Sequence, residues 1–156
     1  MKTAAAPALL TTAFYAFYDL HRPAYHAYAR AHLTPEEATV TVTHIFSLVA
    51  DQWTTVVNDP SPSAWAWARH VRAVSRRAGH STTPAEDADL LHHTLHLSID
   101  KIATVTGTEP ATVTALLGVR HRLATARPTY GPPARPGIRA SSAPSHAPGG
   151  RSRGRA

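Results

Sequence analysis

The stretch SIDKIATVTGTEPATVTALLGVRHRL, from Ser98 to Leu123, predicts two short helices joined by a tight turn. Apolar residues recur at the helical period on both sides of a central glycine. Ala103, Gly107 and Val113 stand at the spacing of a helix-turn-helix. A small residue at 103 lets the helices approach, glycine supplies the turn, and Val113 locks the second helix onto the first. Any other tight helical hairpin is the alternative, and three positions in register favour the helix-turn-helix.

Three earlier segments carry the start signal of a helix, a Ser or Thr that can cap the first turn, followed by a proline. The three pairs are Thr34–Pro35, Ser61–Pro62 and Thr83–Pro84. In the first and the third, a glutamate three residues after the threonine completes a capping box. Gly79 predicts the end of the helix that begins after Ser61, because glycine adopts the left-handed conformation that closes many helices.

The run ATVTVTHIF, residues 38–46, is locally ambiguous. Alternating Val and Thr favour a strand, because both are β-branched and the period is two. A longer stripe at helical spacing decides for a helix, since a strand of that length would be unusual. The stripe consists of Val42, Ile45, Phe46, Val49, Trp53, Val56 and Val57. A second helical stripe, from Phe14 to Tyr28, contains Pro23, which is expected to kink or restart that helix.

These elements predict an all-α fold of two small three-helix clusters, the second of which contains the helix-turn-helix. Residues 8–79 form the first cluster, 80–84 a short linker, and 85–126 the second cluster. Residues 127–156 are rich in Pro, Gly, Ser and Arg and contain few apolar side chains. Such a segment cannot bury enough apolar surface to offset the cost of ordering, so this C-terminal tail is predicted to be disordered.

The positive charge of the chain is concentrated in that tail. The formal net charge is +6, yet residues 127–156 hold six arginines and no acidic residue. Residues 1–126 carry ten basic and ten acidic residues, so the helical part has no net charge. An arginine-rich tail predicts weak, sequence-independent affinity for nucleic acid, although inert extensions of this composition are also common.

One basic helical face lies outside the tail. This arginine surface consists of Arg69, Arg72, Arg76 and Arg77. Its first three members are spaced three and four residues apart, and no acidic residue lies within 60–85. Trp67, two residues before the surface begins, is expected to stack on an unpaired base. Contact with DNA and a solvated face that keeps the protein in solution are both compatible with this pattern.

Several classes of function find no support in the sequence. The chain has no Cys, and therefore no disulfide framework and no Cys nucleophile. A nucleophile elbow, a Gly-rich phosphate loop and an HExxH motif are all missing, so we predict neither an enzyme nor a cofactor. His92, His93 and His96, one turn after Asp89, are spaced to bind zinc. No further ligand completes the set, and we predict no metal site.

The sequence also predicts a protein of the cytoplasm without membrane segments. No apolar run approaches the ~20 residues required to span a bilayer. The first residues, MKTAAAPALLTTAFYAF, are only mildly apolar, and Pro7 and the pair Thr11–Thr12 interrupt them. No clear small-residue cleavage site follows, which disfavours a secretory signal.

The order of these segments resembles a known family. FYDLHRPAYHAYARAHL, ATVTVTHIFSLVADQW and PSAWAWARHVRAVSRRAG are similar in order and spacing to region two of the extracytoplasmic-function sigma factors of bacterial RNA polymerase. HLSIDKIATVTGTEPATVTALLGVRHRL resembles region four of that family. The resemblance covers roughly residues 12–125. It implies that region two binds the RNA polymerase core and melts the minus-ten promoter element, and that region four reads the minus-thirty-five element.

The resemblance also implies roles for individual residues. Those expected to face the polymerase core are Thr43, His44, Ser47 and Asp51. Those expected to contact promoter DNA are Trp67 and the arginine surface in region two, and Thr112, Thr114, Arg120 and Arg122 in region four. An anti-sigma protein is a further partner that the family implies.

At five positions the chain departs from the family pattern. Val40, Thr43 and His44 stand where the family has an acidic residue, Gln and Glu. Thr114 and Leu116 stand where it usually has Lys and Arg, which removes charge-assisted contacts to phosphates and base edges. The alternative to an active sigma factor is therefore a degenerate relative, or a simple helix-turn-helix regulator, that does not initiate transcription.

Overall fold

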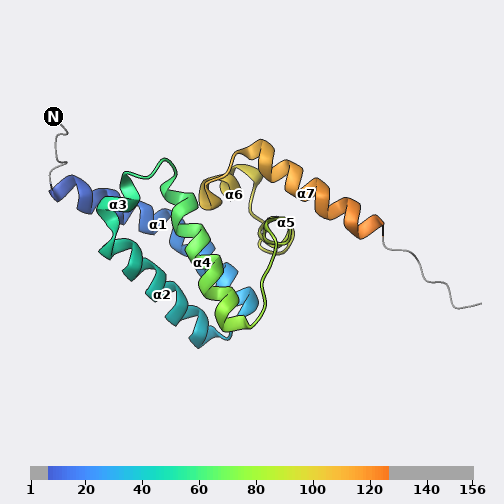
Figure 1. Cartoon of the computed structure of the whole chain (residues 1–156), viewed down its shortest axis with the longest axis horizontal. Coiled ribbons are helices and arrows are strands. Elements are labelled where there is room, and N and C mark those ends of the chain that lie inside the picture. The colour runs from blue at the N-terminus through green and yellow to red at the C-terminus, as the bar shows by residue number, and fades with distance from the viewer. Residues whose placement is uncertain (1–6, 127–156) are drawn as a thin grey trace, which may run out of the picture.

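The computed structural model describes residues 7–126, which form seven α-helices and one π-helical turn and contain no strand (Figure 1). The helices are α1 (Pro7–His32), α2 (Pro35–Asp51), α3 (Trp53–Val57), α4 (Pro62–Ala78), α5 (Pro84–Asp89), α6 (Ile99–Thr106) and α7 (Pro110–Thr125), and the π-helical turn η1 (Leu90–Thr94) follows α5 directly. The predicted all-α class is confirmed. The tail at 127–156, predicted to be disordered, lies outside the described residues.

The predicted helix starts are confirmed in atomic detail. The Thr34 hydroxyl accepts a hydrogen bond from the Glu37 backbone N–H at 3.3 Å, and the Glu37 carboxylate accepts one from the Thr34 N–H at 3.3 Å. The same reciprocal pair joins Thr83 and Glu86 at the start of α5. Ser61 caps α4 by accepting from the backbone of the first turn. Each cap satisfies N–H groups that the helix itself leaves without a partner.

The run at residues 38–46 is helical, as the longer apolar stripe predicts. Val42, Ile45, Phe46 and Val49 are buried on one side of α2, where the helix packs against α1 and α4. The alternating threonines do not form a strand because the apolar residues beyond them repeat at the period of a helix. α2 ends at Asp51, and the remainder of the stripe continues in the one-turn helix α3.

Pro23 does not restart the first helix. α1 runs unbroken over 26 residues with Pro23 inside it. The proline is exposed, so its ring lies on the solvent side of the helix, away from the packed face. The cost is the one backbone hydrogen bond that proline cannot donate. Aromatic residues of α1 that are buried on both sides of Pro23, among them Phe17 and Tyr25, hold the helix against α2 and α4.

The second cluster contains the predicted helix-turn-helix. Gly107 ends α6 with a φ of 70°, and its N–H donates to the Ala103 carbonyl at 2.9 Å. Ala103 and Val113 are both buried, Val113 with 1 % of its surface exposed. The turn also packs against the start of α4, where the Ser61 hydroxyl lies 3.4 Å from the Gly107 carbonyl oxygen. Glycine is required here both for its positive φ and for this close approach.

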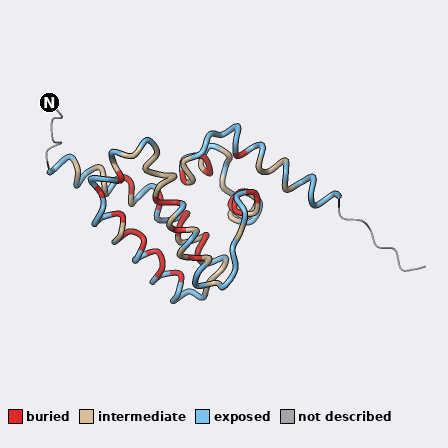
Figure 2. Tube along the Cα trace, viewed as in Figure 1, coloured by how far each residue is buried: buried red, intermediate tan, exposed pale blue. Residues whose placement is uncertain are grey.

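The two clusters share one hydrophobic core. Buried residues of α1, α2 and α4 are continuous with those of η1, α6 and α7, and the buried faces point inwards in Figure 2. The Tyr28 hydroxyl of α1 donates to the Asp87 carboxylate of α5 at 2.7 Å. Residues 80–84 therefore connect two sets of helices that pack on each other.

Candidate nucleic-acid interface

The arginine surface is positioned by the amphipathic pattern of α4. The helix buries Ala66, Trp67, His70 and Val74 against its neighbours. Residues at 69, 72 and 76 lie on the opposite side of the same helix, because three- and four-residue steps return to one face. Arg72, Arg76 and Arg77 are exposed, and Arg69 is half-buried.

Arg69 is held in place by Trp65, one turn earlier. The guanidinium carbon lies 3.4 Å from the centre of the Trp65 ring, and the group donates to the Trp65 carbonyl at 2.9 Å. A guanidinium that stacks on an indole loses little further freedom on binding an anion. Trp65 is not among the residues that the sequence predicted to contact DNA. The four-residue spacing of Trp and Arg is the sequence signal that indicates its contact with the arginine surface.

The arginine surface has no acidic partner among residues 7–126. In this range Arg120 pairs with Glu86 and Asp89, and the Asp89 carboxylate also lies 3.7 Å from His93 Nε2. The positive potential of the four arginines is therefore not neutralised by neighbouring carboxylates of the described helices. An exposed, uncompensated basic face of this kind is the electrostatic pattern of nucleic-acid binding surfaces.

Trp67 does not lie on the arginine surface, where it was predicted to stack on a base. Its side chain is 8 % exposed, and its ring packs edge-on against the rings of Tyr25 and Tyr28, with centroid distances of 5.5 and 4.9 Å. The predicted stacking role is corrected for this reason. The helical period already indicates this placement, because a residue two positions before Arg69 and five before Arg72 does not share their face of the helix, whereas Trp67 does lie with His70 and Val74 on the apolar face.

The helix-turn-helix divides its predicted DNA contacts between two faces. Thr112, Thr114 and Arg122 are exposed on the outer side of α7, as a DNA-facing helix requires. Arg120 lies on the side that faces α5, with nitrogen atoms 3.9 Å from the carboxylates of Glu86 and Asp89. This position directs the Arg120 guanidinium towards α5, and the contact of Arg120 with DNA stays a prediction.

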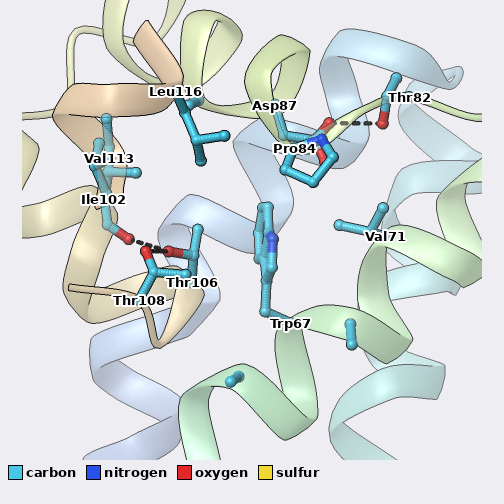
Figure 3. Close-up of a pocket in the computed structure, with 13 residues that line it drawn as sticks. Trp67, Val71, Thr82, Pro84, Asp87, Ile102, Thr106, Thr108, Val113 and Leu116 are labelled. Carbon is cyan, nitrogen blue, oxygen red and sulfur yellow. Dashed lines mark hydrogen bonds between the residues drawn. The ribbon is translucent and has the colours of Figure 1, made fainter. Parts of the chain in front are cut away.

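Leu116 also lies on the inner side of α7. It is half-buried and lines a cavity together with Val113 and Trp67 (Figure 3). A leucine at this position completes the apolar wall between α7 and α4. The apolar side chain at 116 is thereby explained by packing, whereas Thr114 presents an uncharged side chain on the outer face.

The residues predicted to face the polymerase core share one exposed side of α2. Thr43, His44, Ser47 and Asp51 are all exposed. The structure brings His44 next to the arginine surface, because His44 lines a shallow hollow with Arg76 and Arg77. The two predicted contact surfaces are therefore neighbours on the outside of α2 and α4, which the sequence alone could not indicate.

The histidines of η1 are arranged as parts of a helix end. His92 Nδ1 lies 2.9 Å from the Leu97 carbonyl oxygen, and His93 Nε2 lies 3.7 Å from the Asp89 carboxylate. His96 has a positive φ of 57°, which turns the chain after the π-helical turn. Residues 7–126 contain no group of three or more His, Asp or Glu side chains close enough to hold a metal ion.

Comparisons with known proteins gave no relatives: no family model, no curated protein and no solved structure matches the chain. In the part of the chain that the structure describes, no helix combines the length and the apolar character needed to cross a membrane.

Proposed function

We propose that this protein is a sigma factor-like transcription protein that binds the RNA polymerase core through α2 and promoter DNA through α4. The observation that carries the proposal is the exposed arginine surface without a carboxylate partner in residues 7–126. Its position beside the exposed face of α2 supports a joint surface for polymerase and DNA. The outer face of the helix-turn-helix offers hydroxyl groups and a single arginine, Arg122. DNA affinity of the helical part therefore rests mainly on α4.

The double substitution Arg72→Glu/Arg76→Glu is expected to weaken binding to a fluorescent single-stranded oligonucleotide at least tenfold at low salt. The loss of two phosphate contacts on single-stranded DNA also makes the plot of log affinity against log salt concentration less steep, by about 1.4. The measurement is fluorescence anisotropy of the full chain at several salt concentrations. A helical circular dichroism spectrum identical to that of the unchanged protein shows that the fold is retained.

A matched control separates this surface from the general charge of the protein. Arg22→Glu/Arg30→Glu changes the net charge equally, at two exposed arginines of α1. We expect this control to keep most of the affinity, because its residues lie on another helix. An equal loss in both variants would show that charge alone drives binding, and would remove the arginine surface from the proposal.

The contact with polymerase core is tested by co-elution of purified protein with sigma-free core on a sizing column. The unchanged protein is expected to co-elute. Ser47→Arg is expected to abolish co-elution, because it places a large charged side chain in the middle of the exposed face of α2. Thr94→Arg, at an exposed position of η1, serves as the control and should co-elute.

A second candidate function is a regulator that contacts protein or DNA without initiating transcription. The uncharged Thr114 on the outer face of α7 and the position of Arg120 beside Glu86 and Asp89 favour this candidate. Elution of folded protein apart from the polymerase core would decide for it. Retained DNA affinity in the same preparation would then identify a DNA-binding regulator.

A further inference from the structure

A cavity of about 340 Å³ lies where the two clusters meet (Figure 3). Its walls come from α4, from α5 with the segment before it, and from the helix-turn-helix. Most of the lining is apolar, and its larger apolar side chains are Trp67, Val71, Ile102, Val113 and Leu116. Cavities of this size that combine apolar walls with a few polar groups are typical of small-molecule sites.

The polar groups of the cavity lie at two ends. Figure 3 shows Thr82 and Asp87 at one end, Thr106 and Thr108 at the other, and Trp67 between them. The two hydroxyls of Thr106 and Thr108 are hydrogen-bonded to each other at 2.9 Å. Among the residues that line the cavity, Asp87 carries the charged group.

Asp87 is a buried acid whose hydrogen bonds converge on one of its two carboxylate oxygens. Its residue surface is 6 % exposed. Its Oδ1 accepts from the Tyr28 hydroxyl at 2.7 Å and from the Thr82 hydroxyl at 2.6 Å, while no hydrogen bond within residues 7–126 reaches Oδ2. Burial raises the pKa of Asp87, and the two hydroxyl donors only partly oppose that increase. No Lys or Arg of the described helices forms an ion pair with this carboxylate, and the basic group near it is His32, whose own pKa is lowered by burial. A buried carboxylate without a cationic partner is costly, and a cation that enters the site relieves that cost.

Trp67 adds a second feature that favours a cation. One side of its ring packs on Tyr25 and Tyr28, and the ring also forms part of the cavity wall. The face of an indole ring is the best aromatic partner for an ammonium group, especially where water is excluded.

We propose that this cavity binds a small primary amine with an apolar body, whose ammonium group pairs with Asp87 and lies against Trp67. The apolar body then contacts Val71, Ile102 and Leu116. An anion is disfavoured by the carboxylate, and a neutral apolar molecule leaves that carboxylate without its partner. The proposal is independent of the proposed role in transcription, since it concerns only the binding of a ligand to the cavity.

The test uses phenethylamine, which is protonated at neutral pH, and phenethyl alcohol, its neutral analogue of the same shape. Titration calorimetry and NMR shift perturbation of the full chain are expected to give at least tenfold tighter binding for the amine. Asp87→Asn keeps the shape of the side chain and its acceptor oxygen, and is expected to remove the preference. Glu86→Gln is the matched control, because Glu86 is the neighbouring acid and does not line the cavity. It should leave the preference unchanged.

A second variant keeps the test valid if Asp87→Asn does not fold. Ala68 lines the cavity and is exposed, so Ala68→Phe is expected to obstruct the cavity without disturbing the core, and to abolish binding of both probes. Equal affinity for the amine and the alcohol, amine binding that survives both substitutions, or no binding of the amine would each overturn the proposal.

Discussion

Gly107→Ala is expected to lower the free energy of unfolding by at least about 3 kcal/mol, and to leave much of the chain unfolded. A Cβ atom at residue 107 would lie 2.7 Å from both the Ala64 Cα and the Ser61 Oγ, and would also strike the Ala64 backbone nitrogen. Because two of these atoms belong to the backbone of α4, no rotation of a side chain relieves the clash. The φ of 70° adds the strain that a left-handed conformation imposes on any residue with a Cβ.

Gly79 provides a control with the same backbone conformation but without the clash. Its φ is 76°, and a Cβ at this position would have nothing within 4 Å. Gly79→Ala is therefore expected to cost only about 1 kcal/mol, the penalty of the left-handed conformation itself. Urea unfolding followed by circular dichroism measures both variants. Equal losses of stability would contradict the close packing of the turn against α4.

Acidification is expected to destabilise the fold through His70. The side chain is fully buried, and burial lowers its pKa to about 4 from an ordinary value of 6.5. Its Nε2 lies 2.9 Å from the Tyr25 carbonyl oxygen, which only partly opposes this shift. Between about pH 4 and pH 6.5, the imidazole of His70 is protonated to a greater extent in the unfolded chain than in the folded protein. The stability contributed by neutral His70 is therefore complete above pH 6.5 and is lost as the pH falls towards about 4. At the acidic end of this pH range, the free energy of unfolding is lower by roughly 3 kcal/mol.

The contribution of His70 is isolated by His70→Phe, which keeps an aromatic ring where the imidazole stacks on Tyr25 at a centroid distance of 4.4 Å. We expect this variant to show a flatter dependence of the unfolding free energy on pH over this window. His121→Gln removes an exposed histidine and should retain the full dependence. His21, whose pKa is also lowered by burial, accounts for part of the slope that remains in His70→Phe. An unchanged slope in His70→Phe would exclude His70 as the group responsible.

Local signals in the sequence predicted much of the fold. Thr34, Ser61 and Thr83 cap helices because a cap depends on residues within one turn. The helix over residues 38–46 followed from a stripe of apolar residues longer than any ordinary strand. The effect of Pro23 was not predictable from the same rules. A proline on the solvent side of a long helix is tolerated when packing holds both halves in line, and that packing is not local.

The candidate site was predicted less completely, for the same physical reason. The arginine surface followed from the spacing of its residues, but the burial of Trp67 depends on Tyr25 and Tyr28 of another helix. The ion pairs of Arg120 likewise depend on how α7 lies against α5. The cavity exists only because the two clusters pack together, and no sequence pattern specifies that contact.

The close approach of the turn to α4 also limits how this sequence can diverge. A side chain at 107 is obstructed by backbone atoms of Ala64, which every amino acid at 64 would retain. No second substitution at 64 can therefore compensate for a change at 107. The adjacent residues Thr108 and Glu109 are exposed and free of this constraint. In chains that descend from a common ancestor with this one and keep its architecture, we expect glycine to persist at 107 while its neighbours vary.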